Sequence, residues 1–141
     1  MIYAVIDTNV LVSAIMTKNH DAATSRVLNS IFRGIVTPIY NDEIIEEYQD
    51  VLHRDYLKLD PIKCDYAISY IIDAGRNIEA FKSDVKMPDE DDRVFYEVTL
   101  ASQDIDAKLV TGNIKHFPHV DFVLSPAEFC ELIEKIQGSE S

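Results

Sequence analysis

Acidic side chains stand in three distant parts of the chain, each beside an apolar segment. Asp7 directly follows the apolar run 2–6, Glu47 lies within a predicted helix, and Asp91 belongs to an acidic stretch that opens another helix. A carboxylate at the end of a buried strand needs a partner to stay ionised. Carboxylate oxygens are the ligands that Mg²⁺ and Mn²⁺ prefer in proteins. Brought together, these residues could hold a divalent cation that neutralises a phosphate and activates water for in-line attack.

Two of these acidic residues also have ordinary structural explanations. Asp7 begins an Asp-Thr-Asn sequence that is good turn and capping chemistry. Glu47 lies on a helix with Glu43, Glu46 and Asp50, and a solvated helix face accounts for such a group. Glu47 immediately precedes Tyr48 of the helix's apolar face, which favours a position near the sheet, but Glu46 stays open as the ligand.

The stretch 89–92 reads Asp-Glu-Asp-Asp. Acidic residues at a helix N-terminus are stabilised by the helix dipole, yet four in succession repel one another. A bound divalent cation would relieve that repulsion, and so would solvent. Asp91 and Asp92 are adjacent, so either could be the ligand.

Strand and helix patterns alternate along the chain and predict an α/β domain with a mostly parallel sheet. Residues 1–137 form one domain without an internal repeat, and residues 138–141 are expected to fray. Pro38 is expected to stop the second strand. The predicted strands are 2–6, 35–37, 77–81, 108–111 and 121–124, and the predicted helices are 10–15, 22–33, 42–53, 61–74, 92–101 and one that starts at Pro126.

Composition narrows the possible functions. The chain has 141 residues, with 25 acidic against 13 Lys and Arg residues and a net charge of −12. A general basic field for nucleic acid is therefore excluded, although bound cations and a few basic side chains could still handle phosphates. The sequence shows no signal peptide and no apolar run long enough for a membrane span, which predicts a cytoplasmic protein. Cys64 and Cys130 are expected to be small buried side chains rather than a disulfide.

Four short motifs, in this order, resemble the PIN-domain family of metal-dependent ribonucleases, and in particular its branch of toxins from prokaryotic toxin–antitoxin systems. The likeness extends from residue 1 to about residue 130. The motifs are Ile-Asp-Thr-Asn-Val-Leu-Val-Ser at 6–13, Glu-Tyr at 47–48 with Val-Leu at 51–52, Asp-Asp at 91–92 before Val-Phe at 94–95, and Leu-Val-Thr-Gly-Asn at 109–113.

The resemblance implies a three-layer α/β/α sandwich and an acidic cleft that binds one or two Mg²⁺ or Mn²⁺ ions and hydrolyses RNA. It also implies an antitoxin protein as partner and a homodimer, for which exposed apolar residues at Tyr40, Tyr56 and Leu57 are candidates. Matched by position, the catalytic and metal-binding residues are Asp7, Glu47, Asp91 and Asn113, with Asp92 as a further metal candidate and Asn9 and Thr111 as orienting residues.

Asn113 supports the main alternative, a catalytically weak or inactive PIN-fold module that acts by binding a protein or RNA. An amide can ligate a cation through oxygen but adds no negative charge, so a second cation would be held weakly. A phosphatase of the haloacid dehalogenase type would need Asp where Asn9 stands. His116 and His119 have a metal-like spacing but lack further His or Cys ligands for zinc. Candidate RNA contacts are Lys18, Arg26, Lys115 and His116.

Overall fold

The computed structural model describes residues 1–140. Within this range, five parallel strands form one sheet in the order β3-β2-β1-β4-β5. The strand order reverses beside β1, so β1 and β4 flank the switch point at which ligands bind in such sheets. The strands are β1 (Ile2–Ile6), β2 (Val36–Tyr40), β3 (Arg76–Asn77), β4 (Lys108–Val110) and β5 (Val123–Leu124).

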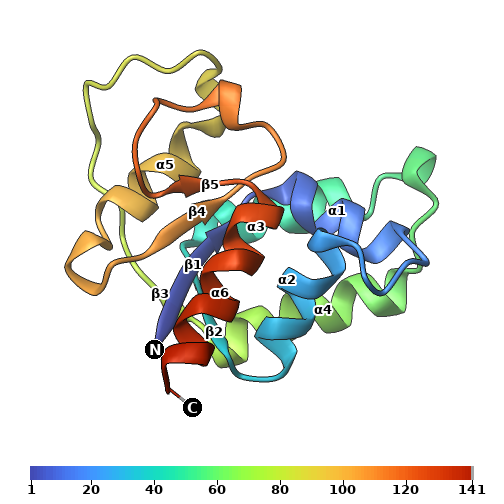
Figure 1. The fold of residues 1–141 in the computed structure, drawn as a ribbon. Helices are drawn as coiled ribbons and strands as arrows, with labels where there is room; N and C mark the ends of the chain where they lie inside the picture. Colours follow the sequence, from blue (N-terminus) through green and yellow to red (C-terminus); the bar gives the residue numbers. More distant parts are fainter. Residues whose placement is uncertain (141) are drawn as a thin grey trace.

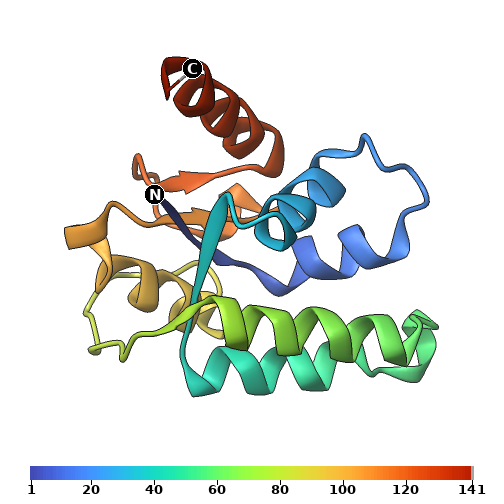
Figure 2. The same cartoon turned by 90° about the horizontal axis from the view of Figure 1, so that it is seen from below.

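Helices cover both faces of the sheet, as the two views show (Figures 1 and 2). Figure 2 places α2 and α4 on one side of the strands and α5 on the other. The helix α3 contacts α1, α4 and α5, and α6 packs against α2 and β5. This is the α/β sandwich that the sequence predicts. In the described part of the chain the α-helices are α1 (Thr8–Met16), α2 (Ala23–Phe32), α3 (Asp42–Leu52), α4 (Pro61–Ala74), α5 (Arg93–Leu100) and α6 (Pro126–Glu140), and the short 3₁₀ turns are η1 (Asp55–Leu57), η2 (Glu90–Asp92), η3 (Gln103–Ile105) and η4 (Ile114–His116).

The central strand β1 is buried because its residues are apolar without alternation. Ala4, Val5 and Ile6 are each at most 1% exposed. A strand that is apolar on both faces packs between two helix layers, as parallel sheets require. The chain therefore delivers the residue after Ile6 to a fixed place at the carboxyl end of the sheet.

Capping residues begin the helices where the sequence predicts them. The side chain of Asn41 accepts a hydrogen bond from the backbone N–H of Ile44 at 2.9 Å, at the start of α3. Ser125 and Glu128 form a reciprocal capping box at the start of α6, with distances of 3.1 and 2.9 Å. Gly34 follows α2 with a φ of 75°, a left-handed conformation that favours glycine.

The structure corrects two details of the predictions. Pro38 does not stop β2, because β3 pairs only with Ile39 and Tyr40 and no ladder on that side needs a donor from residue 38. Tyr40 is not exposed: its ring is buried in β2, and its hydroxyl donates to the carbonyl of Ile72 at 2.8 Å. It therefore cannot serve as the exposed dimer contact. The helix α6 includes residues 138–140 and residue 141 lies outside the described range, so fraying of this end stays a prediction.

Gly75 ends α4 where the chain passes close to β2. A Cβ atom here would lie 2.4 Å from the carbonyl oxygen of Pro38 and 2.6 Å from that of Ile71. The Gly75→Ala substitution is therefore expected to lower the free energy of unfolding by about 1–3 kcal/mol, because backbone must move. Urea denaturation would measure this, with exposed Lys63→Ala on the same helix as a control. Equal stability of the Gly75→Ala and parent proteins would contradict the expectation.

Both cysteines are free and buried, as the sequence predicts. Phe117, in the loop after β4, is also buried. None of the helices in residues 1–140 has the length and apolar character needed to cross a membrane.

Candidate metal centre

Asp7 follows β1 and lies beside the residue that follows β4. The backbone N–H of Asp7 donates to the carbonyl of Val110 at 2.9 Å, which continues the pairing of the two strands by one step. The next residue after β4 is Thr111, whose hydroxyl donates to Asp7 Oδ2 at 2.8 Å. The amide of Asn9 also donates to Asp7 Oδ2, at 3.3 Å. Adjacent parallel strands thus place two motifs that are about 100 residues apart side by side, as Figure 1 shows for β1 and β4.

The side chain of Asp7 is turned to this centre rather than to the helix that it precedes. Asp7 occupies the N-cap position of α1, yet its carboxylate makes no capping hydrogen bond. It is only 4% exposed. Burial raises the pKa of Asp7 to about 6, the Thr111 hydrogen bond opposes this rise, and the charges of Asp92 and Glu47 add to it. The side chain of Asp7 therefore contacts Thr111 and Asn9, and beyond the backbone of Thr8 it does not cap α1.

Asn9 and Thr111 hold the two loops against each other. Asn9 Oδ1 accepts the backbone N–H of Gly112 at 3.1 Å, and Thr111 Oγ1 accepts the backbone N–H of Asn113 at 3.0 Å. A Cβ atom on Gly112 would meet Asn9 Oδ1 at 3.3 Å, so the close approach favours glycine. These bonds fit the orienting role that the resemblance implies for Asn9 and Thr111. Asn113 itself lies at the surface beside this pair of loops.

Glu47 reaches the same centre from α3. Its neighbour Tyr48 is buried, and the ring of Tyr48 packs at a tilted angle against the ring of Phe95. The hydroxyl of Tyr48 donates a hydrogen bond to the carbonyl of Ile6. This anchor at the end of β1 fixes the rotation of α3, so Glu47 faces Thr8, whose hydroxyl donates to its carboxylate. Burial raises the pKa of Glu47, and the charges of Asp92 and then Asp91 raise it further. Glu46, the alternative, is exposed on the helix.

The acidic stretch before α5 is held in place by Arg93. The Arg93 guanidinium pairs with Glu90 at 2.6 Å and donates to the carbonyls of Ser83 and Val85 at 3.0 and 2.7 Å. The largely buried Glu97 accepts the backbone N–H of Ser83. These bonds tie the loop before the acidic stretch to the start of α5 and fix the direction of the carboxylates.

Within this stretch, the charge of Asp92 affects Asp7 and Glu47 more strongly than the charge of Asp91 does. The charge of Asp92 raises the pKa of both Asp7 and Glu47, whereas Asp91 acts on Glu47 but is not among the groups that act on Asp7. Burial is also the main cause of a raised pKa for Asp92 itself. Asp91 is exposed and lines a cavity of about 620 Å³ that it shares with Glu43 and Glu47. Asp7, Glu47 and Asp92 are thus coupled by charge and are called the inner set, with Asp91 beside Glu47 in the cavity. Among the described residues, the ligand atoms of these three do not all lie within 4.8 Å of one another, so a single ion would need water or side-chain movement to reach all of them.

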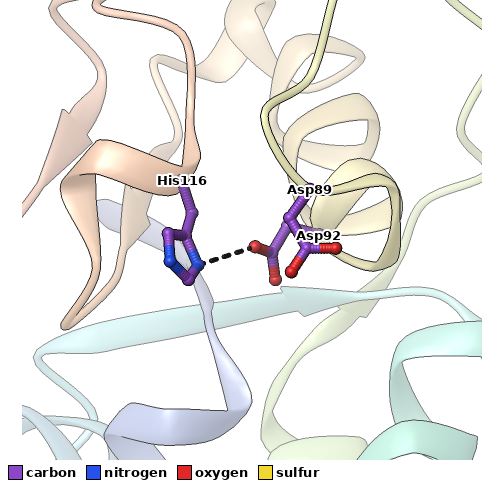
Figure 3. Close-up of side chains that lie close together, drawn as sticks. All are labelled: Asp89, Asp92 and His116. Carbon is purple, nitrogen blue, oxygen red and sulfur yellow. Dashed lines mark ion pairs between the residues drawn. The ribbon is translucent and has the colours of Figure 1, made fainter.

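Asp92 also belongs to a second grouping, shown in Figure 3. One ligand atom each from Asp89, Asp92 and His116 lies within 4.8 Å of the others. His116 Nδ1 is 3.3 Å from Asp92 Oδ2. That oxygen is buried and has no hydrogen-bond partner among the described residues. His116 therefore lies beside the acidic centre, while its sequence neighbour His119 is not part of this grouping.

The other predicted RNA contacts are not concentrated at the centre. Lys18 and Lys115 are exposed. Arg26 forms an ion pair with Glu134 of α6, which occupies its guanidinium. No ion pair found in residues 1–140 joins Lys or Arg to Asp7, Glu47 or Asp92.

Sequence reasoning overlooked Thr8, Asp89 and the hydroxyl of Tyr48. Thr8 could have been suspected because it stands between Asp7 and Asn9 in the first motif. Asp89 opens the acidic run, and its side chain accepts the backbone N–H of Asp91 at 3.0 Å, a local turn signal. No sequence signal connects Tyr48 to the carbonyl of Ile6, since that contact depends on how α3 packs.

The donor set fits a hard or borderline divalent cation. Burial raises the pKa of Asp7, Glu47 and Asp92, neighbouring carboxylates raise each further, and one oxygen, Asp92 Oδ2, is buried without a hydrogen-bond donor. Burying unpaired negative charge is costly unless a counter-charge binds. Mg²⁺ or Mn²⁺ would supply that charge to carboxylate oxygens.

Thr111 allows a test of how the first acid is positioned. Thr111→Val removes the donor to Asp7 Oδ2 while keeping the side chain's shape. The affinity for Mn²⁺ is expected to fall by about 10- to 100-fold, the usual effect of losing a hydrogen bond that orients a ligand. Calorimetry would measure it, with Thr37→Val in β2 as a matched control. Unchanged Mn²⁺ affinity in Thr111→Val would contradict a positioning role.

A family model described as PIN domain matches residues 3–115 of the chain. The matched range includes all the acidic residues of the centre and ends within η4. Neither the curated proteins nor the solved structures that were compared with the chain gave a match.

Proposed function

Because the chain belongs to the PIN-domain family, we propose that it is a ribonuclease that depends on Mg²⁺ or Mn²⁺ and hydrolyses phosphodiester bonds. One observation carries the proposal: Asp7, Glu47 and Asp92 come from three separate segments, and the charge of Asp92 raises the pKa of both Asp7 and Glu47. Structural carboxylates seldom gather unpaired, whereas perturbed groups in a cleft are typical of functional sites.

Asp7 and Asp92 are the residues that would hold the cation, and Asn113 could add an amide oxygen. A bound divalent cation would neutralise the phosphate, lower the pKa of water and stabilise the leaving oxygen. Thr111 and Asn9 fix Asp7 from one side by donating to the same carboxylate oxygen. The two bonds hold the carboxylate in one orientation, and the Thr111 bond partly offsets the rise in its pKa.

Glu47 is suited to take a proton from the attacking water. Its raised pKa makes it a stronger base than a surface Glu, and its link to Thr8 restrains its position. Asp91 and Glu43 line the adjoining cavity, so they lie where an RNA strand would enter. Lys82 lines the same cavity and offers positive charge to a phosphate chain there, whereas the Arg93 guanidinium is already paired with Glu90.

Asn113 favours a second candidate function, a PIN-fold module that binds a partner without cutting RNA. The family's fourth acidic position is neutral here, so a second cation would lack a negative ligand. This module would bind Mn²⁺ weakly and leave RNA intact. The enzyme remains the better-supported proposal, since Asp7, Glu47 and Asp92 do not need Asn113 to form their cluster.

We further propose that the nuclease is the toxin of a toxin–antitoxin pair and forms a homodimer. The resemblance of the motifs supports the toxin role, and the net charge of −12 suits a basic antitoxin segment that enters the acidic cleft. Tyr56, 71% exposed, is the candidate dimer contact that stays available at the surface, with Leu57 beside it.

The test is cleavage of single-stranded and structured RNA by the purified protein with Mg²⁺, with Mn²⁺ and with chelator. We expect cleavage with either ion and none with chelator. The exposed Asp104→Asn variant is the matched control for acidic substitutions at the centre. Cleavage that persists in chelator would contradict the proposal, and metal binding without cleavage would favour the binding module.

A further inference from the structure

The loop after β4 brings an imidazole to the acidic centre. His116 closes the short turn η4, and its backbone N–H donates to the carbonyl of Asn113 at 2.9 Å. The next residue, Phe117, is 4% exposed and anchors the turn in the core. The position of His116 is thus fixed on both sides, and the ring stands opposite the carboxylates of Asp89 and Asp92 (Figure 3).

We propose that His116, Asp89 and Asp92 form a mixed nitrogen and oxygen site that binds a first-row transition-metal ion such as Co²⁺ or Zn²⁺ in preference to Mg²⁺. The inference rests on the proposed function only through Asp92, which both sites share. Three protein ligands would leave further coordination positions for water or a phosphate oxygen.

The spacing of the three ligand atoms supports such a site. Two ligand atoms that are each about 2.1 Å from one ion lie at most about 4.2 Å apart. The three atoms here lie within 4.8 Å of one another. His116 is about half exposed, with 49% of its side chain accessible, so the ring has room to close the small remaining gap.

The charge of His116 and its side-chain contact lower the pKa of Asp92, yet the contact leaves the buried oxygen Oδ2 without a hydrogen bond of good geometry. Nδ1 is 3.3 Å from Asp92 Oδ2, but this oxygen accepts no hydrogen bond from the described residues although it is buried. Asp89 adds a second carboxylate rather than a donor. A cation placed among the three would satisfy the buried oxygen directly.

The chemistry of the donor set selects the class of ion. Imidazole nitrogen suits zinc, cobalt and other first-row transition ions, whereas Mg²⁺ prefers oxygen ligands in near-ideal octahedral geometry. A site with one imidazole and two carboxylates therefore discriminates against Mg²⁺. The purely carboxylate side of the centre, at Asp7 and Glu47, lacks that discrimination.

Calorimetric titration of the full chain with Zn²⁺, Co²⁺ and Mg²⁺ tests the proposal, using His116→Ala, His116→Gln and the nearby His119→Ala as a matched control. We expect both His116 variants to lose about 10- to 100-fold in Zn²⁺ and Co²⁺ affinity, with Mg²⁺ affinity unchanged. His119→Ala should bind all three ions like the parent. Thermal unfolding checks that the variants fold.

A spectroscopic measurement gives an independent readout. Addition of Zn²⁺ should shift the imidazole NMR resonances of His116 and leave those of His119 in place. Equal Zn²⁺ affinity with and without His116, or an unshifted His116 imidazole at saturation, would overturn the proposal. Zn²⁺ binding that needs His116 without any RNA cleavage would leave this site standing and count against the nuclease. Cleavage of RNA with Mg²⁺, together with Zn²⁺ binding that does not need His116, would support the nuclease and overturn this mixed site.

Discussion

Asp7→Asn is expected to lower the rate of RNA cleavage on the order of 10³-fold while leaving the fold intact. The substitution keeps the side chain's size but removes the charge at the point where β1 and β4 bring their loops together. Loss of one preorganised electrostatic contact at a reacting phosphate typically costs about 10² to 10³ in rate, and loss of a cation ligand adds to this. Single-turnover cleavage of a labelled RNA would measure the rate.

Two controls make this result interpretable. Asp104→Asn removes an exposed carboxylate away from the centre and should cleave RNA like the parent. Asp92→Asn should resemble Asp7→Asn, because both carboxylates belong to the inner set. Parent-level cleavage by Asp7→Asn would show that the reaction uses other groups or comes from a contaminating nuclease.

The same Asp7→Asn substitution is expected to stabilise the fold at pH 7 by up to about 3 kcal/mol. The pKa of Asp7 is about 6 in the folded chain against 3.8 as the unperturbed value, mainly because of burial. The folded state therefore binds more protons than the unfolded state between these values, so stability falls as pH rises from 4 to 7. The difference between the two pKa values corresponds to about 3 kcal/mol, and a neutral amide avoids this cost.

Urea denaturation at several pH values would measure this effect. The stability gap between Asp7→Asn and the parent should be largest above pH 7 and should nearly close at pH 4, where the parent's Asp7 is protonated in the folded state. Glu47 and Asp92 also have raised pKa values, so the parent should become more stable on mild acidification even apart from Asp7. A less stable Asp7→Asn variant at pH 7 would contradict the view that this carboxylate strains the fold.

A residue whose neutralisation removes activity but stabilises the fold, as expected for Asp7, is typical of a functional site. A side chain that destabilises the fold while serving a ligand has no structural reason to be charged. Asp7 does not cap α1, and no ion pair within the described chain neutralises it.

The sequence predicts the positions that depend on strand ends and helix caps. The apolar run 2–6 determines where Asp7 emerges, and the strand that ends at Val110 determines where Thr111 does. Neighbouring parallel strands then bring the two together without further information. The caps at Asn41 and Ser125 were readable for the same reason, since each depends on residues within one helical turn.

Features that depend on tertiary packing could not be predicted from the sequence. Within 89–92, the choice between Asp91 and Asp92 depends on the rotation of η2, which Arg93 fixes through Ser83 and Val85. His116 was paired with His119 by spacing, but the fold turns it toward Asp92. Tyr40 was expected at the surface, yet its strand lies inside the sheet between β1 and β3.

Titration of the full chain with Mn²⁺, followed by electron paramagnetic resonance of the free ion, tests the central claim most directly. The claim is that Asp7, Glu47 and Asp92 converge to hold a divalent cation. We expect saturable Mn²⁺ binding by the parent and by Asp104→Asn, and a loss of at least about 10-fold in affinity for Asp7→Asn. Binding of equal strength in Asp7→Asn, or no saturable binding by the parent, would contradict the account.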